Sequence, residues 1–546
     1  MPPANQDMFV QSSAVSKQTL KREVGLIALI ATAITGIIGS GWLFASLYAA
    51  QIAGPAAIFS WLIGGGIAII IALLYAEMSG MLPVTGALTS IPYFSHGTLA
   101  GFLAGWLCWI AYVATAPIEV MAALEYADGY LPWLTQKVDG ERELTHAGLW
   151  AASLMMLIFT VFNMLGVKWL AHANTVISVW KVAVPVVAAF ALIYVGFHAE
   201  NFSSAGGFAP YGVSGVLGAV SSGGVMFSLL GFRTIIDIAG EARNPQRNVP
   251  LAMVIGLLIS LFIYIILQIA FIGAIPPEHL LGGWSKISES APGGPFVGFA
   301  VILGMQWLAF SLYVDAVVSP AGTGVAYVGT TARINYAMAE NKQFPAVFVK
   351  LNKFSVPVWA LAFNFAIGML LFLPFPGWSE LVGFISSAAV LAFSFGPVSH
   401  AALRFQAPDR HRPYRMPLGS FFAMVGFVLI GFVVYWTGWD TNWKVMSLVL
   451  LGLPILVISR SVTKAGRLPL EAGHVSWFLL YVVALALVSF MGNYGNGLGL
   501  LPTGIDLLII TVVSLLIFRM AVNQRLPNDL CNERVEIAMQ ASAVES

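Results

Sequence analysis

Long apolar segments recur between residues 24 and 520, and they constrain the fold more than any other feature of this chain. A helix that crosses a bilayer needs about 20 consecutive apolar residues. Hydrophobic residues make up 58% of the chain and charged residues 9%, and the mean hydropathy is +0.84. Soluble domains carry about 25% charged residues. The sequence therefore predicts an all-α polytopic membrane protein.

Fourteen segments are candidate spans, and the expected total is twelve to fourteen because the last four segments are short. The loops between them are too short for a separate soluble domain. The candidate spans are 24–50, 55–80, 98–127, 148–167, 171–197, 213–239, 250–274, 295–325, 356–375, 379–403, 419–437, 443–460, 474–491 and 503–520.

The distribution of lysine and arginine tests this count, because cytoplasmic loops are enriched in both residues. With the amino terminus in the cytoplasm, alternation places twenty cations inside and four outside, and leaves Lys181 and Arg233 within the membrane. The split favours fourteen spans with both termini cytoplasmic. The four external cations are Lys137, Arg142, Lys286 and Lys444. The twenty internal cations are Lys17, Lys21, Arg22, Lys168, Arg243, Arg247, Arg333, Lys342, Lys350, Lys353, Arg404, Arg410, Arg412, Arg415, Arg460, Lys464, Arg467, Arg519, Arg525 and Arg534.

Two further features concern processing and metals. Residues 1–23 are polar and the first apolar segment is too long for the core of a signal peptide, so no cleavable leader is expected. The two cysteines, Cys108 and Cys531, provide neither a disulfide framework nor a metal cluster. We therefore expect no metal and no cofactor.

Glycine is concentrated inside two of the candidate spans. The first span contains Gly36, Gly39 and Gly41, and the sixth contains Ser221-Ser-Gly223-Gly224 followed by Gly231. Each glycine costs a helix interior about 1 kcal/mol relative to alanine. The pattern indicates either close packing between helices or an unwound turn. Interrupted helices at matching positions of two halves are typical of a transporter's binding site.

Four motifs carry a resemblance to a known family. They are Gly39-Ser40-Gly41 in the first span, LPVTGALTSIPYF at 82–94, GEARNPQRNVPLA at 240–252 and ARINYAMAENKQFP at 332–345. They resemble the substrate-carboxylate loop and the loops after helices 2, 6 and 8 of the amino acid–polyamine–organocation (APC) superfamily of transporters. The chain looks similar to the bacterial aspartate–proton symporters of that superfamily.

The resemblance implies a LeuT-like fold, with two inverted five-helix repeats and broken helices 1 and 6. It divides the chain into a cytoplasmic tail (1–23), a transport core of ten helices (24–405), four accessory helices (406–520) and a cytoplasmic tail (521–546). We expect the last of these to be polar and loosely structured. The repeat itself is inferred, because the two halves share no clear similarity in sequence.

The resemblance also implies where the substrate lies. A free helix amino terminus binds anions through its N–H groups, so the α-carboxylate is expected on the backbone of Ser40 and Gly41. The α-ammonium is expected at carbonyl groups of both broken helices, and an aromatic residue is expected to cover the substrate. The residues expected to bind substrate are Ile37, Ile38, Gly39, Ser40, Gly41, Phe227, Ser228, Leu230, Gly231 and Arg233.

Lys181 lies well inside the fifth span, in HANTVISVWKVAVPVV. One interpretation is a lysine that extends to the cytoplasmic face. The resemblance favours another, because proton-coupled members carry a lysine here whose ammonium replaces a sodium ion between helices 1 and 8. A desolvated lysine loads and releases protons more readily than a solvated one. Lys181 is therefore the leading candidate for proton coupling.

Arg233 raises a similar choice. It lies four residues before Asp237, so the two side chains are neighbours on one helical face and could form a structural pair or a gate. It also lies two residues beyond Gly231, at the expected unwound turn, where some relatives that take cations carry an acid. A guanidinium there suits a second carboxylate. This hypothesis predicts aspartate or glutamate as substrate.

The other charged residues inside or near the spans divide into two groups. Asp315 in span 8 either faces Lys181 or a polar cavity, or is structural, and Glu119 in span 3 is a rival proton carrier. Asp237 joins them as a candidate for coupling. Four further residues are expected at membrane interfaces or helix ends, namely Glu77, Glu125, Asp128 and His400.

These features favour a secondary transporter that takes up an acidic amino acid with protons. The expected partners are an amino acid, protons and the lipid bilayer, with no nucleic acid. An exchanger and a neutral amino acid permease of the same fold are the alternatives. A membrane enzyme is disfavoured because no paired His-Asp cluster, nucleophile elbow or phosphate-binding loop is found, and nothing resembles a selectivity filter. We expect a bacterial inner membrane protein that is not an enzyme.

Overall fold

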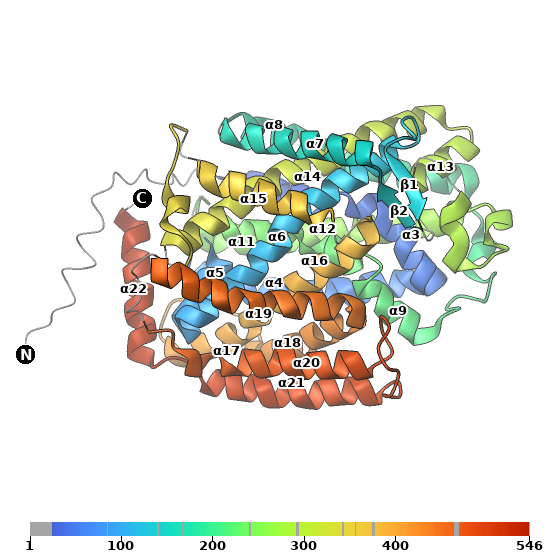
Figure 1. The fold of residues 1–546 in the computed structure, drawn as a ribbon. Helices are drawn as coiled ribbons and strands as arrows, with labels where there is room; N and C mark the ends of the chain where they lie inside the picture. Colours follow the sequence, from blue (N-terminus) through green and yellow to red (C-terminus); the bar gives the residue numbers. More distant parts are fainter. Residues whose placement is uncertain are drawn as a thin grey trace, which may run out of the picture.

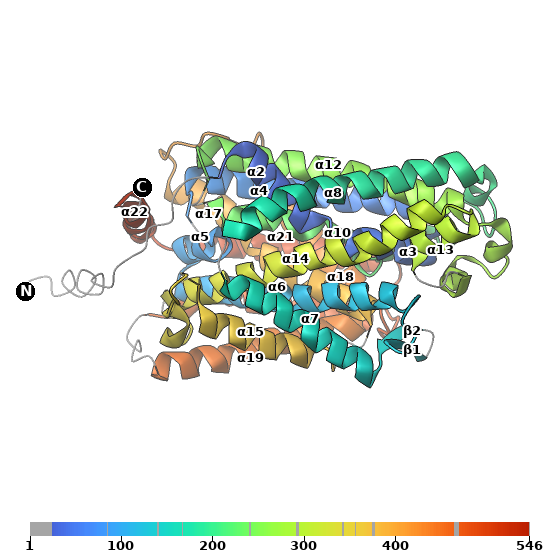
Figure 2. The same ribbon diagram turned by 90° about the horizontal axis from the view of Figure 1, so that it is seen from above.

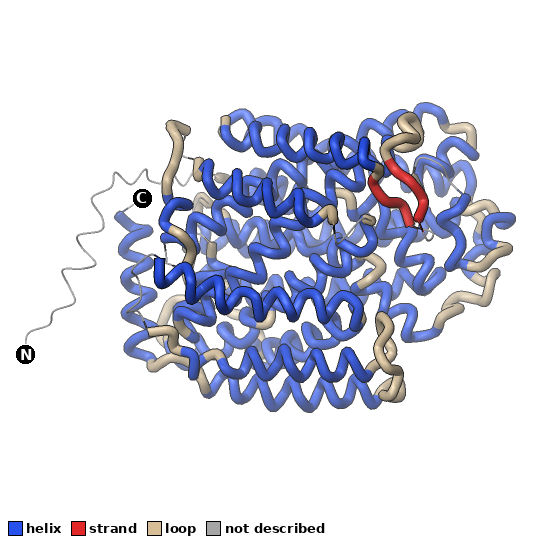
Figure 3. The backbone as a smooth tube through the Cα atoms, viewed as in Figure 1, coloured by secondary structure: helices blue, strands red, loops and turns tan. Residues whose placement is uncertain are grey.

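The computed structural model describes residues 24–84, 86–138, 141–165, 168–239, 242–290, 294–340, 343–354, 356–373, 377–462 and 469–544. The predicted amino-terminal tail at 1–23 therefore lies outside the described residues, as do Lys342, Lys464 and Arg467. Within the described part the chain is helical apart from one antiparallel hairpin, β1 (Thr135–Val138) and β2 (Glu141–Leu144) (Figure 3).

Figures 1 and 2 show most helices running side by side along one direction. The hairpin and α13 lie at one end of this bundle, and α5 and α22 lie at the other. The helices are α2 (Leu26–Ile37), α3 (Gly41–Ala53), α4 (Ala57–Met81), α5 (Ala87–His96), α6 (Thr98–Ala127), α7 (His146–Met164), α8 (Lys168–Gly196), α9 (Gly212–Ser221), α10 (Val225–Leu229), α11 (Arg233–Asp237), α12 (Pro245–Ala274), α13 (Pro295–Ile302), α14 (Gln306–Glu340), α15 (Val358–Leu371), α16 (Trp378–Phe393), α17 (Phe395–Gln406), α18 (Gly419–Thr437), α19 (Trp439–Val462), α20 (Ser476–Met491), α21 (Ile505–Asn523) and α22 (Asn528–Val544).

The prediction of an all-α polytopic membrane protein is confirmed. Among the described residues, ten helices are long and apolar enough to cross a membrane, or eleven when the bent segment α9–α11 counts as one span. Each of the fourteen predicted segments overlaps at least one helix. The total of fourteen membrane crossings stays a prediction.

Burial separates the central helices from the peripheral ones. The most apolar stretches of α6 and of α16–α17 are buried throughout, whereas only about a third of the corresponding stretches of α7, α8, α19 and α21 is buried. A helix that is apolar on all sides belongs in a protein core or in lipid. α6 is therefore a central element against which the other helices of the site are placed.

Both glycine-rich spans are broken. The first span stops at Ile37 and resumes at Gly41, and Ile38 between them has an extended backbone with φ −86° and ψ 95°. The sixth span bends by 45° between α9 and α10. It then tightens into a short 3₁₀ turn, η4 (Leu230–Phe232), before α11 begins.

The eighth span differs from its predicted bounds. A separate short helix, α13, precedes it, because Gly304 between α13 and α14 takes a left-handed φ of +71° that ends the first helix. α14 then runs without interruption to Glu340. Residues 332–340 of the motif expected as a loop are therefore helical, and only its last residues leave the helix.

The carboxyl terminus also differs from the expected loose tail. Residues Asn528–Val544 form α22, which lies across one end of the bundle and packs on α5 and α17 (Figure 1). Arg534 pairs with Glu471, which also accepts the backbone N–H of Thr98 at 2.7 Å. The composition of this segment is polar, but the bundle provides a surface that buries one side of it.

Candidate functional site

The two broken spans approach each other closely at glycines. A Cβ on Gly231 would lie 2.2 Å from the carbonyl carbon and oxygen of Gly36, and a Cβ on Gly41 would lie 2.3 Å from the Oγ of Ser228. Only glycine permits such close approach of backbones. The glycines therefore serve close packing and the interrupted helix at the same place.

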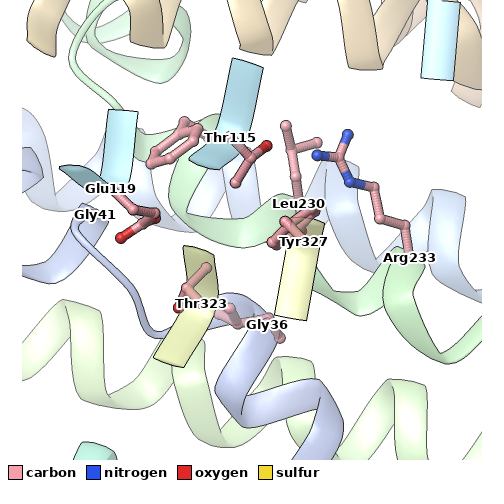
Figure 4. Close-up of a pocket in the computed structure, with 10 residues that line it drawn as sticks. Gly36, Gly41, Thr115, Glu119, Leu230, Arg233, Thr323 and Tyr327 are labelled. Carbon is pink, nitrogen blue, oxygen red and sulfur yellow. The ribbon is translucent and has the colours of Figure 1, made fainter. Parts of the chain in front are cut away.

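A small cavity lies at this junction, and Figure 4 shows side chains from α6, α14 and the sixth span around it. Five residues predicted to bind substrate line it, and Glu119 lies across the cavity from Arg233 (Figure 4). The lining residues are Gly36, Ile37, Gly41, Thr115, Glu119, Phe227, Leu230, Arg233, Thr323 and Tyr327.

The predicted carboxylate loop holds a carboxylate of the protein itself. The backbone N–H of Ser40 donates to Oε2 of Glu119 at 2.7 Å. A Cβ on Gly39 would lie 2.6 Å from Oε1 of the same side chain, so glycine at 39 is what lets Glu119 reach the loop. Glu119 therefore occupies the donor that the sequence assigns to a substrate carboxylate.

The carbonyl groups at the interruption of the first span already accept hydrogen bonds from the protein. The carbonyl oxygen of Ile37 accepts from the Tyr264 hydroxyl at 2.8 Å, and that of Ile38 lies 3.4 Å from Oγ1 of Thr323. Each carbonyl has a second lone pair for another donor. Ser228, also predicted to contact substrate, instead donates its hydroxyl to Gly224 in its own helix at 2.8 Å.

Aromatic side chains close one side of the cavity. Phe227 meets Trp378 of α16 edge to face, with ring centroids 5.9 Å apart. Trp378 donates its indole N–H to Oγ of Ser40 at 3.1 Å and stacks on Phe44 and Tyr48. This arrangement joins Phe227 to the carboxylate loop, and the contribution of α16 was not anticipated from the sequence.

Lys181 is buried between the first and eighth spans. Its ammonium donates to the carbonyl oxygen of Thr35 at 3.1 Å and to Oγ1 of Thr323 at 2.6 Å. The side chain is 0% exposed. It therefore does not extend to a solvent-exposed face, and its position between α2 and α14 matches the place that the resemblance implies.

Arg233 is buried on aromatic rings. Its guanidinium lies 4.1 Å from the ring centroid of Tyr112 and 5.3 Å from that of Tyr327, and the residue is 2% exposed. Its Nε has no hydrogen-bond partner, and no carboxylate of the described residues lies within the 4.0 Å of an ion pair. Cation–π contacts stabilise a desolvated charge only in part.

Asp237 does not neutralise Arg233 directly. One of its carboxylate oxygens accepts from the Tyr112 hydroxyl at 2.6 Å, and the other, Oδ1, is buried without a hydrogen-bond partner. Tyr112 thus contacts both residues, Arg233 through its ring face and Asp237 through its hydroxyl. The close intrahelical pair that sequence spacing allows is not formed in this structure.

The remaining candidates lie away from the cavity. Asp315 is buried beside Trp42 and Ser319. Glu77 is held by Arg404, Arg412 and His400, with ion contacts of 2.7, 3.2 and 3.0 Å. At the hairpin end Asp128 pairs with Arg142, and Glu125 is buried near the end of α6.

Several contacts of this site were missed by sequence reasoning. Thr323 and Tyr327 line the cavity from α14, and Asp315 and Ser319 precede them at the same spacing of four residues. Residues at that spacing share one helical face. This polar row along an otherwise apolar span is a signal that could have identified them.

Comparisons with known proteins show the family of the chain. Residues 24–458 match the family model described as amino acid permease. The chain is 36% identical over 528 residues to the glutamate/serine transporter AimA of Bacillus subtilis (strain 168), covering 95% of this chain and 97% of that protein.

Two other relatives are informative. The chain is 38% identical over 517 residues to the aspartate-proton symporter of the same strain, covering 94% of this chain and 98% of that protein. It is 29% identical over 406 residues to cationic amino acid transporter 4 of Homo sapiens, covering 71% of this chain and 60% of that protein. With broken spans, a cavity between them and a family match over most of its length, the chain belongs to the amino acid permease family of integral multi-pass membrane transporters.

Proposed function

We propose that the chain takes up an acidic amino acid, aspartate or glutamate, together with protons by alternating access. The observation that carries this proposal is the guanidinium of Arg233, which lines the cavity without a carboxylate partner among the described residues. A buried unpaired cation in a membrane span is costly. A substrate with a second carboxylate would satisfy it.

The two ends of the cavity suit the two ends of such a substrate. The N–H groups of Ser40 and Gly41 would hold the α-carboxylate, and the planar fork of Arg233 would hold the side-chain carboxylate. The printed names of two relatives include glutamate and aspartate. Aspartate and glutamate differ by one methylene, which a pocket distinguishes by only about 1–3 kcal/mol.

Two groups support coupling to protons. Lys181 places an ionisable nitrogen between α2 and α14, in contact with Thr35 beside the broken turn. Glu119 occupies the N–H of Ser40 that the substrate carboxylate needs. Protonation of Glu119 would remove a negative charge from the path of an anionic substrate, so a proton would accompany its entry.

Two alternative functions use the same fold and the same cavity but differ in the substrate or in how its transport is coupled. An exchanger would move one amino acid against another. A neutral amino acid permease would leave Arg233 outside the substrate contacts. A membrane enzyme finds no support in the relatives, which are named transporters and permeases. We place the protein in a bacterial inner membrane with both termini in the cytoplasm, as the distribution of cations predicts.

The test is uptake of radiolabelled aspartate into proteoliposomes, with and without an inward proton gradient. Wild-type protein is expected to accumulate aspartate only with the gradient. Arg233→Ala removes a charge-assisted contact worth about 1.5–3 kcal/mol, so the KM for aspartate is expected to rise on the order of 10- to 100-fold. Uptake of a neutral amino acid is expected to change far less.

Two further variants make the result specific. Arg233→Lys keeps the charge but loses the planar fork, and we expect an intermediate KM. Arg142→Ala removes an arginine from the hairpin, outside the cavity, and should transport aspartate as wild type does. Normal aspartate uptake by Arg233→Ala would contradict the acidic-substrate proposal and leave the family assignment intact.

A further inference from the structure

The carboxylate of Asp315 has no part in the function proposed above. It is 0% exposed in α14, and its two oxygens accept from neutral donors. The indole N–H of Trp42 lies 3.0 Å from Oδ2, and the hydroxyl of Ser319 lies 2.9 Å from Oδ1. No lysine, arginine or histidine nitrogen of the described residues lies within 4.0 Å of it. A carboxylate buried in a membrane span without a cation is a functional candidate.

A row of polar side chains lies along α14 between Asp315 and the residue that contacts Lys181. Asp315, Ser319 and Thr323 follow one another at intervals of four residues and therefore share one face of α14. Ser319 and Thr323 are both buried. Thr323 accepts from the ammonium of Lys181 at 2.6 Å. The row thus extends about 12 Å along the helix, at 1.5 Å per residue, and ends at the candidate coupling group.

The row begins on the outer side of Lys181. α14 starts at the hairpin end of the bundle and runs toward the end that carries α5 and α22 (Figures 1 and 2). In the proposed topology the hairpin end faces outward. Asp315 follows the start of α14 at Gln306, and Thr323 comes two turns later. Asp315 therefore lies nearer the outer end of α14 than Thr323, which contacts Lys181.

The groups around Asp315 leave it few alternative partners. The titratable groups that face it are Lys181 from α8 and Tyr126 from α6. α3 contributes Trp42, and α13 contributes Phe296, whose ring centroid lies 5.4 Å from that of Trp42. Among these neighbours of Asp315, Lys181 is the group that can accept a proton as a neutral amine.

Asp315 also contacts the outer half of the first broken span. Trp42 directly follows Gly41, which lines the cavity, and both belong to the first turn of α3. A charged acceptor makes a stronger hydrogen bond than a neutral one. Protonation of Asp315 would therefore weaken its hydrogen bond with Trp42. The protonation state of Asp315 would thus influence the position of the neighbouring Gly41.

We propose that Asp315 receives the external proton and passes it along Ser319 and Thr323 to Lys181. This inference rests on the proposed proton-coupled function. In the transfer the Oδ1–H bond of Asp315 breaks and an N–H bond forms on the neutral amine of Lys181. Each hydroxyl takes up one proton and releases one, so it ends unchanged. A carboxylate and an ammonium remain.

The test compares two transport modes in proteoliposomes. Exchange of radiolabelled aspartate for internal aspartate, at equal pH on both sides, needs no net proton movement. Accumulation driven by an inward proton gradient does need it. Asp315→Asn is expected to lower gradient-driven accumulation at least tenfold more than it lowers exchange. The matched control is Asp506→Asn, a buried carboxylate bonded to Tyr435 at 2.6 Å in α21, which should affect both modes equally.

Ser319→Ala is the second variant, because it keeps the carboxylate and removes only the first hydroxyl of the row. We expect gradient-driven accumulation to fall at least fivefold while exchange changes less than twofold. If Asp315→Asn fails to fold, this variant alone decides the question. Equal effects on both modes in every variant that folds would overturn the inference.

The outcomes also separate this inference from the proposed function. If wild-type protein shows no gradient-driven accumulation of aspartate, the proposed function fails and the inference fails with it. If wild type accumulates aspartate and Asp315→Asn does so equally well, only the role of Asp315 is lost. Lys181 would then exchange its proton by another route.

Discussion

Gly231 has no room for a side chain, because the backbone of Gly36 lies against it. Overpacking a close-packed site typically costs 1–3 kcal/mol. Gly231→Ala is therefore expected to separate the two broken spans, to reduce aspartate uptake to less than about a tenth of wild type and to lower the melting temperature in detergent.

Gly66 provides the matched control. It lies in α4, is exposed, and an added Cβ would meet no atom within 4 Å. Gly66→Ala should leave uptake unchanged and leave the melting temperature equal or slightly higher, since alanine favours a helix over glycine. Equal behaviour of the two variants would show that the Gly36–Gly231 approach is not needed for transport.

The sequence indicated which charges are unusual, but not what surrounds them. Lys181 and Arg233 stand out because a cation in an apolar span is rare at any position. Their partners come from distant segments: Lys181 meets Thr323, which is 142 residues away along the chain, and Ser40 meets Glu119, which is 79 residues away. Spacing within one helix suggested Asp237 as the partner of Arg233, whereas in the fold both residues contact Tyr112.

At the scale of helices, the polar composition of α22 does not predict that this helix packs on α5 and α17. Its first turns carry Cys531, which is 0% exposed. Burial raises the pKa of this thiol to about 11. At pH 8 the reactive thiolate is then roughly one molecule in a thousand, compared with about a quarter for a free thiol of pKa 8.5.

We therefore expect a maleimide to label Cys531 on the order of 100-fold more slowly in the folded protein than after denaturation. The assay uses a Cys108→Ala background, so that one thiol remains. Arg534→Ala removes the pair with Glu471 and should speed labelling by loosening α22. The control is Arg525→Ala, whose guanidinium lies over Phe405 instead. Fast labelling of the folded background protein would contradict the docking of α22.

For the molecule as a whole, the apolar segments predicted the fold well because a bilayer leaves helices few alternatives. The predicted bounds of the eighth span were wrong where the chain leaves the bilayer and this constraint no longer applies. α14 continues to Glu340, beyond the length a bilayer requires, and α13 forms before it. Neither feature follows from hydropathy, since both depend on packing outside the apolar stretch.

The membrane topology is open to a direct measurement. Fourteen spans with both termini inside predict that residues 139 and 496 lie outside and that residues 409 and 525 lie inside. Alkaline phosphatase fused after residues 139 or 496 should be active in a bacterial host, and fusions after 409 or 525 should be inactive. An active fusion at 525 with an inactive one at 496 would instead mean an odd number of crossings before the tail, and the cation count would have misassigned the last helices.

The docking of α22 on α5 joins segments that lie far apart along the chain. The backbone N–H of Leu526 donates to the carbonyl oxygen of Ser95 at 2.9 Å, and Gln406 bridges the same carbonyl to Leu526. A ribosome makes α5 (Ala87–His96) long before α22 (Asn528–Val544). The surface of α5 that α22 covers therefore stays exposed until α22 has been synthesised. A chain truncated before α22 leaves this surface exposed. Proteolysis that responds to exposed surfaces would therefore act on chains that lack α22 before it acts on chains that contain it.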